Sequence, residues 1–63
     1  MTYKVMCSFL TGYEVFDDRF DGEYSGIEHD TREAAALEAR EARQIMKDEG
    51  YVEPIVWVEE YGE

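Results

Sequence analysis

Residues 30–50 read DTREAAALEAREARQIMKDEG, and the rest of the architecture is arranged around this stretch. From Thr31 to Glu49 it holds strong helix formers with no Gly or Pro, and Gly50 stands where a glycine often follows a helix. The first four letters, DTRE, have the form of a capping box, with Asp30 as the N-cap and Thr31 as the alternative. The sequence therefore predicts one helix over residues 31–49.

One face of this predicted helix is apolar and small. At about 100° per residue, five side chains fall on a single stripe: Ala35, Ala39, Ala42, Ile45 and Met46. Because most of the stripe is alanine, we expect the helix to lie close against a sheet.

The segment before the helix predicts a hairpin. Residues 2–10 alternate apolar and polar side chains with the period of a strand, and Thr11-Gly12 is a turn signal. Residues 13–16 are predicted as the returning strand. Its end is open, because the pattern either runs on through Phe20 or breaks at Asp17-Asp18. Asp21-Gly22 is a further turn signal, and residues 23–29 are expected to be a loop or a short extra strand.

The segment after the helix predicts one last strand, residues 55–61, which is β-branched and aromatic with Pro54 at its start. The predicted order is therefore β-β-α-β, an α+β fold. A hairpin and one crossover place the third strand beside the first. We expect a three-stranded antiparallel sheet of order 2-1-3, with one helix on one face, and residues 1–63 as a single small domain.

The composition excludes several functional classes. The chain carries 16 acidic and 6 basic residues, a net charge of −10, so direct binding to nucleic-acid phosphates is not expected. A single Cys rules out a disulfide framework. The longest apolar runs fall far short of the roughly 20 residues of a membrane span, and no signal peptide is expected.

The negative charge is concentrated in the predicted strands and their loops. Residues 14–30 hold seven acids against Arg19, whereas residues 31–49 hold five acids against four bases. Carboxylates on alternate strand residues, about 6.6 Å apart, can imitate backbone phosphates. The candidate partner-binding residues are Glu14, Asp17, Asp18, Asp21, Glu23, Glu28, Glu59 and Glu60. The alternative is a solvated acidic surface without a partner, or adaptation to high salt.

Aromatic side chains supply a second candidate surface. There are too many of them to face an alanine-rich helix, and Met6, Leu10 and either Ile55/Trp57 or Val56/Val58 are expected on the opposite face of the sheet. Such a two-sided apolar sheet suggests a docking face or a homodimer. The candidate interface aromatics are Phe16, Phe20, Tyr24, Trp57 and Tyr61.

The sequence contains no arrangement typical of catalysis, so we expect neither an enzyme nor a cofactor. Residues 17–28 share some spacing with an EF-hand loop, but Arg19 occupies a ligand position and a strand precedes the loop. His29 has no second His or Cys nearby, so we expect it to be exposed and no metal to bind. Cys7 lies on the apolar phase of the first strand, and we expect a buried thiol.

In size, charge and predicted order, the whole chain resembles the small acidic anti-CRISPR proteins of phages, in particular those that mimic DNA against type I surveillance complexes. The residues that carry the resemblance are the acidic stretches 14–30 and 53–63. The resemblance implies a protein partner with a cationic nucleic-acid-binding surface, a CRISPR effector subunit, and action in the cytoplasm of an infected bacterium without a cofactor. A small interaction or assembly module that uses the aromatic sheet face is the second hypothesis.

Overall fold

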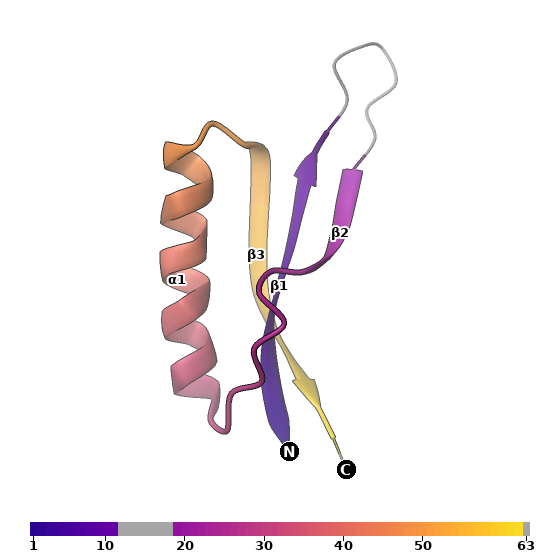
Figure 1. Cartoon of the computed structure of the whole chain (residues 1–63), viewed down its shortest axis with the longest axis vertical. Coiled ribbons are helices and arrows are strands. Elements are labelled where there is room, and N and C mark those ends of the chain that lie inside the picture. The colour runs from indigo at the N-terminus through magenta and orange to yellow at the C-terminus, as the bar shows by residue number, and fades with distance from the viewer. Residues whose placement is uncertain (12–18, 63) are drawn as a thin grey trace.

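The computed structural model describes residues 1–11 and 19–62 (Figure 1). Its elements are β1 (Thr2–Leu10), β2 (Arg19–Glu23), α1 (Arg32–Asp48) and β3 (Val52–Tyr61). The strands form one sheet of order β2-β1-β3, and both pairings are antiparallel. The predicted α+β class, strand order and single helix are confirmed. In the part of the chain that the structure describes, no helix combines the length and apolar character that crossing a membrane requires.

The second strand differs from the prediction. Residues 13–18 lie outside the described residues, so the choice between a strand that runs on and one that breaks at Asp17-Asp18 stays open, and the described strand runs over 19–23. The predicted turn at Asp21-Gly22 is wrong, because both residues pair with β1. Gly22 has a packing role instead. A Cβ atom at this position would lie 3.0 Å from Cζ of Phe20, whose ring covers the glycine.

The helix begins one residue later than an N-cap at Asp30, the first choice from the sequence, would place it. Thr31 has extended backbone angles, and its side-chain oxygen accepts a hydrogen bond of 3.1 Å from the N–H of Ala34. Thr31 is therefore the N-cap, and Asp30 precedes it.

The helix ends in the predicted glycine, in the geometry of a Schellman motif. Gly50 has φ of +83°, which a residue without Cβ adopts at little cost. Its N–H donates to the carbonyl of Lys47 at 3.2 Å, and the N–H of Tyr51 donates to the carbonyl of Met46 at 3.0 Å. These two bonds satisfy carbonyls that the last turn of a helix leaves without partners.

The core lies between α1 and one face of the sheet. Its buried residues are Val5, Cys7, Ala35, Ala39, Ala42, Met46 and Val56. Four of the five predicted stripe residues are therefore buried. Ile45 is the exception, with 45% of its surface exposed. It lies about 60° of arc from Ala42 on the side away from Met46, beyond the narrow strip that the alanines bring against the sheet.

The last strand starts at Val52, so Pro54 lies within it and not at its start. Opposite the two-residue step from Ser8 to Leu10, β3 advances by three residues, from Ile55 to Val52. This extra residue makes a β-bulge, and within it Glu53 has φ of +50°.

Strand register decides which apolar residues face the helix. Val56 lies opposite buried Cys7 and Val58 opposite buried Val5, so these valines face α1. The alternative that places Ile55 and Trp57 on the other face, which the sequence left open, is therefore the correct one.

Candidate functional site

The candidate site is the face of the sheet that points away from α1, which we call the open face. Alternation along the strands and the observed register decide which side chains lie on it. They include Thr2, Lys4, Met6, Ser8 and Leu10 of β1, Arg19, Asp21 and Glu23 of β2, and Ile55, Trp57, Glu59 and Tyr61 of β3. Within residues 1–11 and 19–62, no helix or other strand covers this face.

A carboxylate held between two aromatic side chains is the most ordered feature of the open face. The indole Nε1 of Trp57 donates to Oε1 of Glu59 at 3.0 Å, and the hydroxyl of Tyr61 donates to Oε2 at 2.7 Å. These two hydrogen bonds, first that from Trp57 and then that from Tyr61, lower the pKa of Glu59. Glu59 is therefore held as an anion in one orientation.

Tyr61 connects this carboxylate to the first strand. Its hydroxyl lies 3.7 Å from Sδ of Met6, and Nζ of Lys4 lies 5.2 Å from its ring centroid. The hydrogen bond to Glu59 raises the pKa of Tyr61, because ionised tyrosine would lose the donor and face a second negative charge. The phenol is thus neutral at ordinary pH and presents its ring to a cation.

Two basic residues moderate the charge of the open face. Nζ of Lys4 lies 2.6 Å from Oε1 of Glu23, and this hydrogen bond raises the pKa of Lys4. Nη1 of Arg19 donates to the buried hydroxyl of Ser8 at 2.9 Å. Three acids and two bases therefore share the open face, so it is a mixed polar and aromatic surface, not a plain row of carboxylates.

The structure brings together only part of the predicted acidic set. Asp21, Glu23 and Glu59 lie on the open face. Glu60 lies opposite Tyr3 on the helix side, so it does not share a face with Glu59. Glu28 follows β2 and accepts a hydrogen bond of 3.2 Å from Oγ1 of Thr2 at the rim. Three further predicted residues lie outside the described residues: Glu14, Asp17 and Asp18.

The predicted aromatic set is divided in the same way. Trp57 and Tyr61 lie on the open face, whereas Phe20 faces the helix side and stacks on Phe9 with ring centroids 5.1 Å apart. Tyr24 packs against the core, so it too is not on the open face. Phe16 lies outside the described residues. Strand parity explains the division, since residues an odd number of positions apart on one strand point to opposite faces.

One polar cluster was not predicted. Oε2 of Glu38 accepts a hydrogen bond of 2.7 Å from Ser25, and its Oε1 lies 2.7 Å from Nε2 of His29. Backbone bonds between His29 and Tyr3 hold the same segment against β1. His29 is consequently half-buried, with 17% of its side chain exposed, which corrects the expectation of an exposed histidine. Because these residues are far apart in the sequence, no spacing indicates the cluster.

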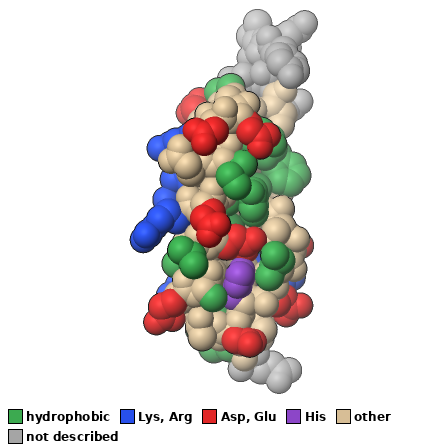
Figure 2. Space-filling view, turned by 60° about the vertical axis from the view of Figure 1, so that its left-hand side comes forward, with side chains coloured by type: hydrophobic (Ala, Val, Ile, Leu, Met, Phe, Trp, Pro, Cys, Tyr) green, Lys and Arg blue, Asp and Glu red, His purple; other side chains and the backbone are tan. Residues whose placement is uncertain are grey.

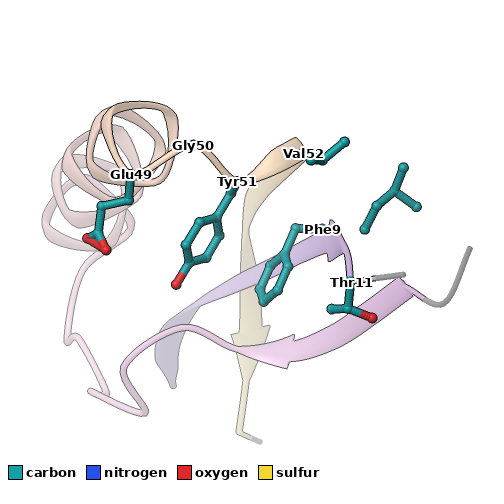
Figure 3. A pocket seen from close by; sticks show the side chains of 7 residues that line it. Phe9, Thr11, Glu49, Gly50, Tyr51 and Val52 are labelled. Atoms are coloured by element: carbon teal, nitrogen blue, oxygen red, sulfur yellow. The ribbon is translucent and has the colours of Figure 1, made fainter. Parts of the chain in front are cut away.

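A shallow hollow of about 390 Å³ lies where β1, α1 and β3 meet (Figure 3). The rings of Phe9 and Tyr51 lie side by side beside it, with centroids 4.7 Å apart and their planes tilted by 54°. Glu49 is the one charged side chain among the described residues that line it, so these residues offer no second charge with which to orient a small ligand.

Two further kinds of chemical site would be a metal-binding cluster and a reactive thiol. No cluster of three or more His, Cys, Asp or Glu side chains that could hold a metal occurs among residues 1–11 and 19–62. The thiol of Cys7 is buried, as predicted, and burial raises its pKa.

No family model, no curated protein and no solved structure matches this chain.

Proposed function

We propose that this protein is a small binding protein that docks on a cationic protein partner through the open face of its sheet. The observation that carries the proposal is the aromatic-flanked carboxylate of Glu59. An arginine or lysine of the partner placed there would meet a fixed anion flanked by two aromatic side chains.

The overall charge supports a cationic partner. A net charge of −10 attracts a positive surface over a distance and speeds encounter at low salt. The aromatic side chains then supply the short-range contact, since Trp and Tyr are enriched among the residues that dominate binding energy. Ile55, of which 51% is exposed, extends the apolar part of the same surface.

A DNA-mimic inhibitor of a CRISPR effector is the more specific form of this proposal. The excess of acids over residues 14–30 favours it, and two of those acids, Asp21 and Glu23, lie on the open face. The effector subunit would supply the cationic surface, and the protein would occupy the place of target DNA. A module for other protein assemblies, acting through Trp57 and Tyr61, is the second form.

The test is an electrophoretic mobility shift of target DNA by type I surveillance complexes, with and without this protein. The inhibitor form expects loss of the shift at low salt and its return at high salt. Asp17→Lys with Asp18→Lys should also restore it. An unchanged shift for complexes of several subtypes would contradict this form and leave the assembly module.

Direct binding to any partner so identified tests the open face itself. Trp57→Ala and Glu59→Lys should each weaken binding by at least about tenfold, as expected for residues at the centre of an interface. Leu37→Ala and Glu41→Lys are the controls, because both residues are exposed on α1. Glu41→Lys repeats the charge change, and Leu37→Ala removes another exposed apolar side chain. Equal effects of the two pairs would refute docking through the open face.

A further inference from the structure

The outer edge of β3 and one side of α1 form a second surface, separate from the open face. The first part of this surface is the outer edge of β3, and the backbone hydrogen bonds of β1 show which groups point towards it. The N–H groups of Tyr3 and His29 each donate to the other's carbonyl at 2.8 Å, and the N–H of Tyr24 donates to the carbonyl of Val5 at 2.9 Å. Odd-numbered residues of β1 therefore direct their backbone groups towards β2. The even-numbered residues direct theirs towards β3.

The same pattern shows which residues of β3 direct their backbone groups away from β1. In an antiparallel pair, the partners of those odd-numbered residues form the pairs without hydrogen bonds, so their N–H and C=O groups face away from β1. In β3 these are Val56, Val58 and Glu60. Pro54 has the same parity, and its missing N–H agrees with an outward position. Among residues 1–11 and 19–62 no strand pairs with this outer edge, so these backbone groups can pair with a further strand, although the carbonyl of Val56 already accepts a bond from Arg43.

The second element is a basic stripe on α1, formed by Arg32, Arg40, Arg43 and Lys47. At 3.6 residues per turn, these four exposed side chains lie within about 80° of arc. None of them forms an ion pair with another residue among 1–11 and 19–62. The basic side chains in Figure 2 gather along one side of the molecule, whereas acidic ones are spread over the face shown.

Arg43 shows that the stripe and the edge adjoin. Its Nη2 donates to the outward carbonyl of Val56 at 3.1 Å. A guanidinium that binds a lone carbonyl has further donors to offer. A carboxylate placed at this edge would make a stronger, charge-assisted bond with it.

From these observations we infer that the outer edge of β3 binds an extended acidic segment of another protein, which adds to the sheet as a fourth strand. Main-chain bonds to Val56, Val58 and Glu60 would supply the pairing, and carboxylates on alternate residues would meet the basic stripe. The occupant is acidic because four of the six basic residues of the chain gather here, although the chain as a whole is strongly negative.

A second copy of this chain fits the surface less well than a separate acidic segment. Antiparallel pairing of two β3 edges about a two-fold axis would put both helices on the same side of a continuous sheet. The two basic stripes would then face each other, and like charges in such a position repel.

The binding test uses a fluorescent peptide of alternating Glu and Thr, measured by anisotropy with the full chain at low salt. We expect saturable binding that is lost when the alternate backbone nitrogens on one edge of the peptide are methylated. Arg40→Glu with Lys47→Glu should weaken it by about tenfold or more, as the loss of two surface ion pairs and their replacement by repulsion predict. Arg19→Glu with Lys4→Glu is the control of equal charge, and it should leave peptide binding nearly unchanged. Circular dichroism must show this control folded, because Lys4 bonds Glu23 and Arg19 bonds Ser8 across β1 and β2.

Amide hydrogen exchange locates the contact without any substitution. The peptide should protect the N–H groups of Val56, Val58 and Glu60, and not those of β2. Equal binding of the methylated peptide, or no binding at all, would overturn the inference. Protection of the same amides without peptide, caused by self-association, would also overturn it. Tighter binding of an oligothymidine that protects none of these amides would overturn it as well.

Discussion

At the residue scale, Glu59 is one of many acids in the chain, but it alone among the described acids accepts hydrogen bonds from two aromatic side chains. Its neighbours in sequence, at two positions before and after, lie on the same face of β3 and both donate to its carboxylate. Because its pKa is lowered in the folded state, these bonds stabilise the fold above the ordinary carboxyl pKa. Their contribution is lost as pH falls through the lowered value.

We predict that Trp57→Phe raises the pKa of Glu59 towards its ordinary value, because the larger of the two stabilising bonds is removed. Tyr61→Phe should have the same direction with a smaller effect. Carboxyl ¹³C shifts followed through a pH titration measure both, and circular dichroism establishes that the variants remain folded. An unchanged titration in folded Trp57→Phe would contradict the bond that the structure shows.

A second prediction at this scale concerns Cys7, of which only 3% is exposed and whose pKa is raised by burial. The thiolate is the reactive form, so both access and ionisation are reduced. We expect slow reaction with a disulfide reagent in buffer near pH 8 and fast reaction in denaturant. Fast modification of the native protein would show that the core opens readily in this region.

At the scale of elements, α1 has a cap at each end, and the sequence predicts the C-terminal one less ambiguously than the N-terminal one. Both Asp30 and Thr31 fit the N-cap pattern, and only backbone geometry distinguishes them. The C-terminal signal is less ambiguous, because Gly50 is the first glycine after a long run of helix formers and no competing residue lies beside it.

We predict that Thr31→Ala lowers the free energy of unfolding by about 1 kcal/mol, the usual value for loss of an N-cap hydrogen bond. Asp30→Ala is the matched control and should cost less than half as much, since it removes a negative charge near the helix start but no cap. Urea unfolding of the two variants measures both quantities. A larger loss from Asp30→Ala would indicate that Asp30 caps the helix in solution.

Gly50→Ala should also be destabilising, by about 1 kcal/mol, because alanine at φ of +83° carries a steric cost that glycine avoids. Nothing lies within 4 Å of the position that an added Cβ would take, so crowding does not contribute. Thermal unfolding compared with Ala36→Gly, which changes an exposed position inside α1, separates the backbone cost from helix propensity. If Gly50→Ala melted at the same temperature as the wild type, that result would contradict a left-handed conformation at Gly50.

At the scale of the whole molecule, a core of small and β-branched residues supports a chain whose charges mostly repel. Among residues 1–11 and 19–62 Lys4 pairs with Glu23 and His29 hydrogen-bonds with Glu38, which leaves most of the acids without a basic partner. Self-repulsion therefore opposes the compact state, and salt screens it.

We predict that the melting temperature rises as NaCl is increased from about 0.02 M to about 0.5 M, a range over which the screening length falls severalfold. Glu41→Lys removes two negative units at an exposed site and should reduce this gain. Circular dichroism at neutral pH measures both. A melting temperature that falls with salt would mean that attraction between opposite charges outweighs the repulsion.

The sequence by itself determined the helix, its alanine stripe, its final glycine, the order of the strands and the excess of acid. These depend on residues near one another in the chain, where propensity and periodicity act directly. Only the tertiary structure decided that Asp21-Gly22 belongs to a strand, that Glu59 and not Glu60 lies on the face away from α1, and that Arg43 adjoins the outer edge of β3. The first two depend on strand register, which pairs residues distant in sequence, and a shift of one position would exchange the faces of every side chain on a strand. The third depends on how α1 packs across the sheet.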